Sequence, residues 1–141
     1  MFIMQCTPRG MGAFAEATEV ILQKISFRPV NSIIFISGLD GGDAPYPVWG
    51  AQVLATPSCI SIACYPEQDG PTTIALGDMQ EADRGAPASF EATLETPGGS
   101  VIISTADQQT ILRKPVNKDK VRIRIWLNHP KWADDIVVGI E

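Results

Sequence analysis

The sequence predicts an all-β fold, a single antiparallel β-sandwich domain of about eight strands. The first observation is the stretch 118–127, K-D-K-V-R-I-R-I-W-L, in which apolar and polar residues alternate. The second is a series of short β-branched runs at regular spacing with turn residues between them. The third is size and composition, because 141 residues with 45% hydrophobic and 19% charged suit one globular domain with its own core.

The alternation in 118–127 predicts a strand with one dry face and one wet, basic face. The apolar face carries Val121, Ile123, Ile125 and Leu127, and the other carries Lys120, Arg122, Arg124 and Trp126. Antiparallel sheets have this pattern because one face packs on a core while the other meets water. Two facing sheets are therefore expected.

The other strands are expected wherever β-branched residues lie between turn signals. Their ranges are 32–37, 58–65, 72–76, 90–95, 100–104, 110–113 and 136–140. The turn 67–70 predicts that 58–65 and 72–76 form a hairpin, and Pro97-Gly98-Gly99 predicts a second turn before 100–104. Gly38 to Gly50 is expected to be a long irregular loop that folds back onto the body.

Residues 1–12 are expected to be a leader outside the domain at 13–141. Thr7 to Gly10 interrupts their apolar stretch, which does not suit a signal peptide, although Ala13-Phe14-Ala15 resembles a cleavage site. Residues 13–24 have the composition of a short helix and also read as the start of a strand, so both interpretations stay open.

Three cysteines, Cys6, Cys59 and Cys64, cannot all pair within the chain, so reduced thiols in a cytoplasmic protein are expected. Cys64 shares its parity with Ile60 and Ile62, which predicts a core position. The apolar runs are too short to span a bilayer, so no membrane is expected as a partner.

Charge is segregated along the chain, beneath a net charge of -5. From Gly38 to Glu95 nine acidic residues stand against Arg84 alone, and from Thr96 onward seven basic residues stand against five acidic ones. An acidic protein repels phosphate backbones, so nucleic acid is not expected as a partner. The acidic middle instead favours a basic protein.

No constellation of residues predicts catalysis. His129 is the only histidine, and Asp134 and Asp135 could contact it, but no nucleophile motif accompanies it. Asp40 and Asp43 flank two glycines without the spacing of a calcium loop. We therefore expect no catalytic residues, no metal and no cofactor.

Two carboxylates on one strand face, Glu91 and Glu95, are expected to face Arg122 and Arg124 across neighbouring strands. An anion site built from the basic face with Trp126 is the alternative. The paired arrangement is the simpler interpretation, because it needs only sheet geometry.

The order of features resembles the competence protein J family of nuclease inhibitors. The similarity rests on strand 32–37, the proline-rich loop with Trp49, S-C-I-S-I-A-C-Y, F-E-A-T-L-E-T-P-G-G-S-V-I-I-S-T, K-V-R-I-R-I-W-L and I-V-V-G-I-E, within residues 32–141. The segment through Gly12 and the loop 128–135 have no assigned counterpart. The resemblance implies a β-sandwich that binds and silences another protein.

The sequence therefore predicts a non-enzymatic binding module of inhibitor or immunity type, whose acidic loops meet a basic partner such as a nuclease. The expected partner-binding residues are Asp40, Asp43, Tyr46, Trp49, Asp78, Glu81 and Asp83. Steering by charge followed by burial of an aromatic anchor is the expected mechanism.

Two alternatives stay open. One is a small-ligand or carbohydrate-binding β-sandwich with its site near Trp126, His129 and Trp132. The other is a structural homo-oligomer, because edge strands are templates for pairing.

Overall fold

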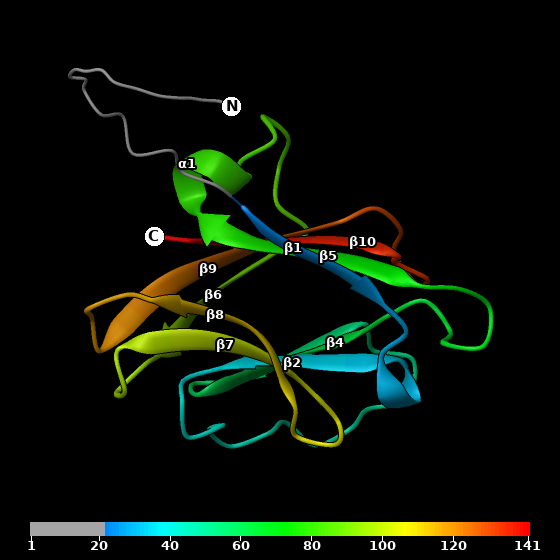
Figure 1. Cartoon of the computed structure of the whole chain (residues 1–141), viewed down its shortest axis with the longest axis horizontal. Helices are drawn as coiled ribbons and strands as arrows, with labels where there is room; N and C mark the ends of the chain where they lie inside the picture. Colours follow the sequence, from blue (N-terminus) through cyan, green and yellow to red (C-terminus); the bar gives the residue numbers. More distant parts are fainter. Residues whose placement is uncertain (1–21) are drawn as a thin grey trace, which may run out of the picture.

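The computed structural model describes residues 22–141 as two facing five-stranded sheets, which confirms the predicted all-β sandwich (Figure 1). Sheet A has the order β1 (Gln23–Phe27), β5 (Thr72–Asp78), β10 (Asp135–Ile140), β9 (Lys120–Leu127) and β6 (Phe90–Glu95). Sheet B has the order β3 (Val53–Thr56), β4 (Cys59–Ala63), β2 (Ile33–Ser37), β7 (Ser100–Thr105) and β8 (Thr110–Pro115). Two short helices, η1 (Val30–Ser32) and α1 (Met79–Ala82), complete the described chain.

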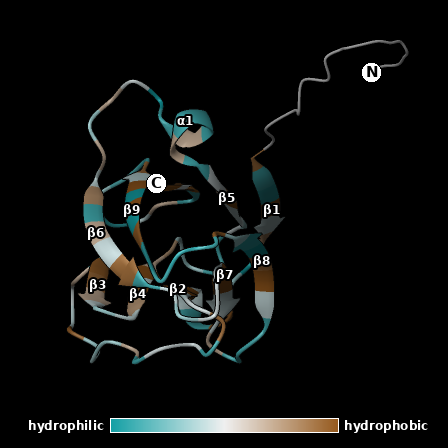
Figure 2. Cartoon of the chain, turned by 90° about the vertical axis from the view of Figure 1, so that its left-hand side faces the viewer, coloured by the Kyte–Doolittle hydropathy of each residue, from teal (hydrophilic) through white to brown (hydrophobic). Residues whose placement is uncertain are grey.

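The core lies between the sheets and is built by the inward face of each strand. The predicted apolar face of β9 supplies Val121, Ile123 and Ile125, all buried. Sheet B faces them with alternate residues of β2, β4 and β7, namely Ile34, Ile36, Ile60, Ile62, Val101 and Ile103, and each of these six is fully buried. Figure 2 shows the two layers from the side, with hydrophobic residues along the strands. Burying each such side chain contributes about 1.5–3 kcal/mol to folding.

One strand pair departs from the antiparallel pattern. β10 lies between β5 and β9 and pairs in parallel with β5, with Ile136 opposite Ile74, while it runs antiparallel to β9. The run Ile136-Val137-Val138 is apolar on both faces and buried throughout, as expected for a parallel strand covered on both sides. The last strand of the chain is thus the central strand of its sheet.

The predicted hairpin between 58–65 and 72–76 is wrong. β4 pairs with β2 and β3 in sheet B, whereas β5 pairs with β1 and β10 in sheet A. The chain changes sheets after β4, and the Tyr65 amide donates to the Ala133 carbonyl at 2.8 Å, just before β10. The turn after Pro66 therefore connects the layers.

The described chain has ten strands where about eight were expected, since β3 was not predicted and β1 was only one of two open interpretations. Residues Gln23–Phe27 form a strand, so the strand interpretation holds at the end of the segment 13–24. The rest of that segment and the leader at 1–12 lie outside the described residues. Among the described residues, no helix has the length and hydrophobicity needed to cross a membrane.

Candidate partner-binding site

The acidic residues singled out from the sequence fall on two opposite layers of the sandwich. Asp40, Asp43, Tyr46 and Trp49 lie on the 38–52 loop, which joins β2 to β3 on the side of sheet B, as the teal segment in Figure 1 shows. The remaining three lie at or beside α1, which packs on sheet A; they are Asp78, Glu81 and Asp83. The structure therefore places the first group on one loop and the second on the other layer.

The 38–52 loop begins with a tight turn. The Gly41 amide donates to the Gly38 carbonyl at 3.1 Å, and the Gly42 amide donates to Oδ1 of Asp40 at 3.1 Å. Gly42 has a φ of +61°, and a Cβ there would lie 2.1 Å from the Ser58 carbonyl oxygen. Only glycine fits this close approach of two backbones.

The loop is then attached to the β3–β4 turn. The Asp43 amide donates to Oγ of Ser58 at 2.8 Å, and Oγ1 of Thr56 donates to the Asp43 carbonyl at 2.6 Å. At its far end the Ala51 amide donates to the Val48 carbonyl at 3.1 Å, and the Gln52 carbonyl accepts from the Ala63 amide at 2.8 Å. Both ends are fixed to sheet B, so the tip is presented from a rigid base.

The tip of the loop exposes aromatic rings to solvent. The side chain of Trp49 is 99% exposed and that of Tyr46 is 91% exposed, and Leu39 and Val48 are exposed as well. Four of the six large exposed hydrophobic residues in the described chain thus lie on this one loop. Sequence reasoning missed Leu39 and Val48, although apolar residues inside a glycine- and proline-rich loop were the available signal. Clustered exposed apolar side chains mark binding surfaces.

The two acidic side chains on this loop carry uncompensated charge. Neither Asp40 nor Asp43 forms an ion pair with another described residue. Asp78, by contrast, lies 3.4 Å from Nζ of Lys114 on β8, so its charge is balanced by the chain itself. The loop combines free negative charge with exposed aromatic surface, and α1 does not.

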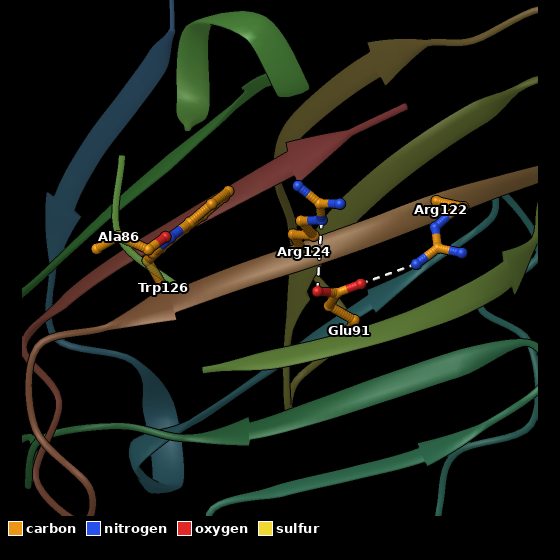
Figure 3. Close-up of polar contacts among 5 residues, drawn as sticks. All are labelled: Ala86, Glu91, Arg122, Arg124 and Trp126. Carbon is orange, nitrogen blue, oxygen red and sulfur yellow. Dashed lines mark hydrogen bonds and ion pairs between the residues drawn. The ribbon is translucent and has the colours of Figure 1, made fainter. Parts of the chain in front are cut away.

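The outer face of sheet A is internally paired. Glu91 on β6 accepts from Arg122 at 2.8 Å and lies 3.5 Å from Nε of Arg124, so it sits between the two guanidinium groups (Figure 3). This agrees with the pairing expected for Glu91, while Glu95 lies opposite Lys120 instead. Arg122 and Arg124 share one carboxylate.

Trp126 is buried, which corrects the prediction of a wet outer face along the whole of β9. Its ring is 8% exposed and packs with Ala82 of α1 and with Ala75 and Val137, and its Nε1 donates to the Ala86 carbonyl at 2.9 Å (Figure 3). α1 and the chain after it form this cover. The sequence offered no helix signal there, because α1 is one turn long.

The other two members of the alternative ligand site lie on the exposed 128–134 loop. Nδ1 of His129 accepts from the Trp132 amide at 2.9 Å, and Trp132 is 46% exposed beneath Nζ of Lys131. The His129 ring thus shapes its own loop. The structure does not bring Trp126 to the surface beside these two residues.

Both described cysteines have free thiols. Cys64 is buried in the core, as its parity predicted, and burial raises its pKa to about 12. Cys59 lies on the outer side of sheet B; burial, with a smaller effect from the nearby Asp43 carboxylate, raises its pKa to about 11. Neither thiol is a thiolate at neutral pH, so neither is activated as a nucleophile.

Residues 22–141 contain no cluster of three or more histidine, cysteine or acidic side chains with metal-binding geometry. No arrangement of base and nucleophile accompanies His129 in that range. The 38–52 loop itself presents two carboxylates and two exposed rings, and its ends are hydrogen-bonded to sheet B.

Comparison with known proteins finds a solved structure with a similar fold. No protein-family model and no curated protein sequence matches the chain. Among solved structures, the chain is similar to ComJ from Bacillus subtilis, described as an inhibitor of the DNA-degrading activity of NucA, with a TM-score of 0.62 and 10% sequence identity. The match covers 87% of this chain and 98% of ComJ. The resemblance expected from the strand order is thus confirmed at the level of the fold: this chain has a β-sandwich similar to that of ComJ.

Proposed function

We propose that this protein is a non-enzymatic inhibitor-type module that binds a basic protein, such as a nuclease, through its 38–52 loop. The observation that carries the proposal is the joint presence of unpaired carboxylates at Asp40 and Asp43 and exposed rings at Tyr46 and Trp49 on one anchored loop. The fold shared with ComJ supports an inhibitor role.

The mechanism follows from the two kinds of side chain. The free carboxylates attract a basic surface and raise the association rate, and this effect weakens as salt is added. Trp49 then enters a pocket of the partner, where an aromatic anchor contributes most to affinity. Because the loop ends are hydrogen-bonded to sheet B, little conformational entropy is lost when the partner binds.

The acidic residues at α1 have a secondary part in this proposal. They add to the long-range negative field but lie on the opposite layer, so they do not touch a partner seated on the loop. The buried, unreactive thiols suit a reducing compartment, so we place the protein in the cytoplasm.

The test is affinity capture from the native cell, followed by an assay of the captured protein. The wild-type chain is expected to retain a basic protein whose degradation of DNA slows when the chain is added. Asp40→Lys with Asp43→Lys is expected to abolish retention, whereas Glu81→Lys with Asp83→Lys, the matched pair at α1, retains it. Equal retention by the loop variant would contradict the proposed surface, as would a captured protein with no basic character.

A further inference from the structure

A groove crosses the outer face of sheet B beside the 38–52 loop. It has a volume of about 480 Å³, bounded on one side by residues 39–44 and on the other by the turn between β7 and β8. A volume of this size holds one long side chain with the backbone that carries it. Nothing in the proposed function so far uses this groove.

The floor of the groove combines apolar side chains with the hydroxyl of Ser104. Its apolar lining comes from Phe35 on β2, Ile102 on β7 and Cys59 on β4. These side chains are close together because Ser37, two residues after Phe35 on β2, pairs with Cys59 on one side and with Ile102 on the other. Phe35 is half-buried, so part of its surface faces the groove. The floor suits an aliphatic stem or a flat group.

One wall of the groove is negative, because Asp40 lines it. Gln108 on the other side is uncharged, and its neighbour Asp107 accepts a hydrogen bond from the Thr105 hydroxyl. The negative charge of Asp43 also reaches the floor, since it adds to the raised pKa of Cys59. No described lysine or arginine lines the groove, so its charge is unbalanced.

We infer that this groove binds an arginine side chain of the partner, with the guanidinium beside Asp40 and its stem on Phe35 and Ile102. The inference rests on the proposed function, because the basic partner supplies the arginine. Arginine fits better than lysine for two reasons: its planar head packs on an aromatic ring, and it is more weakly hydrated, so it loses less on entering a groove with apolar side chains on its floor.

The first test uses a defined probe and needs no partner. The peptide acetyl-Gly-Arg-Gly-amide is titrated into the ¹⁵N-labelled full chain, with the peptide in which citrulline replaces arginine as the neutral, nearly isosteric control. The arginine peptide is expected to shift the amide signals of Gly41, Gly42, Ser104 and Gln108, with millimolar affinity. The citrulline peptide is expected to shift none of them, and the lysine peptide to bind more weakly than arginine.

The second test uses two matched variants. Asp40→Asn removes the charge but keeps an oxygen for the Gly42 amide, so the turn survives; affinity for the arginine peptide is expected to fall about tenfold. Asp83→Asn is the control, since Asp83 makes the same kind of turn with the Gly85 amide at 2.8 Å on the opposite layer, and it is expected to change nothing. Equal shifts with citrulline, shifts confined to α1, or equal loss in both variants would overturn the inference.

A third variant separates this inference from the proposed function. Ser104→Trp fills the groove from its floor, and Thr93→Trp places the same ring on the exposed face of β6. Amide spectra check that both remain folded.

Loss of the captured partner in Ser104→Trp alone supports the groove. Retention in Ser104→Trp, together with loss in Trp49→Ala, rejects the groove and leaves the proposed function standing. Arginine binding with no partner captured rejects the proposed function and leaves the groove.

Discussion

The two outer faces of this sandwich are covered in opposite ways. On sheet A, α1 closes over Trp126, and Glu91 forms ion pairs with Arg122 and Arg124. On sheet B, the 38–52 loop is fixed at its ends, leaves its rings exposed and its carboxylates without an ion pair to another described residue, and borders an open groove. The difference separates a cover that stabilises the fold from the loop that we propose as the partner-binding surface.

The largest effect is expected from Trp126→Ala on the sheet A side. Removing a buried tryptophan leaves a cavity beneath α1, so the free energy of unfolding should fall by about 3 kcal/mol, measured by urea denaturation. Trp132→Ala, at a half-exposed ring, is the control and should change stability by less than about 0.5 kcal/mol. Similar losses in both would show that α1 does not protect the core.

Trp49→Ala should give the converse result. Its side chain is 99% exposed, so unfolding should be unchanged, while affinity for the captured partner should fall by about 2 kcal/mol, or about 30-fold. Calorimetric titration measures the change. Val30→Ala removes an exposed apolar side chain outside the loop and should leave binding intact. An effect as large as that of Trp49→Ala would contradict the proposal that the partner binds on the 38–52 loop.

Charge removal should distinguish the faces through the association rate. Asp40→Asn with Asp43→Asn should slow association about threefold or more at low salt, because these carboxylates face the partner in the proposed complex. Glu81→Gln with Asp83→Asn removes the same charge on the other layer and should have a smaller effect. Both effects should vanish at high salt, and stopped-flow measurements across ionic strength would detect a reversed order.

Breaking the charge pairing on sheet A should have a small effect. Glu91→Gln loses both arginine contacts, but the carboxylate is 44% exposed, so stability should fall by at most about 1 kcal/mol. Glu95→Gln is the control, since Glu95 makes no ion pair with another described residue. Partner binding should be unchanged in both, and weaker binding by Glu91→Gln would assign sheet A a part in recognition.

The reactivity of the two described cysteines measures how well the 38–52 loop and the core exclude solvent. In a Cys6→Ser background at pH 8, a thiol reagent should react slowly with the native chain and reach Cys59, under the loop, before Cys64 in the core. Folding raises both pKa values above the ordinary thiol value of 9.0, so both thiols favour the folded state below pH 9. That contribution should disappear as pH rises through about 11 for Cys59 and about 12 for Cys64. Faster reaction of Cys64 would contradict the assignment.

Much of the fold could be predicted because β9 and its neighbours repeat a two-residue pattern that only a half-buried strand satisfies. The predicted hairpin was wrong because a turn sequence does not say which sheet receives the next strand. Here the chain passes from sheet B to sheet A after β4, where the Tyr65 amide donates to the Ala133 carbonyl. The parallel pairing of β10 was equally hidden, since its partner lies more than fifty residues away.

The candidate site was only partly predictable. The glycines, prolines and aromatic residues of 38–50 indicated an unusual loop, but they suggested that Tyr46 and Trp49 fold back onto the body, whereas both are exposed. The attachment of Asp43 to Thr56 and Ser58 depends on tertiary contacts, and so does the groove. The acidic residues of the 38–52 loop and those at α1 lie on two layers, because the chain passes from sheet B to sheet A before β5 and α1.

The central place of β10 affects how the protein is made. Sheet A cannot join β5 to β9 until residues 135–140 have left the ribosome, because β10 supplies the pairing on both sides. Sheet B needs nothing beyond residue 115. During synthesis the sheet that carries the 38–52 loop can therefore assemble first, and the cooperative closure of the two sheets waits for β10.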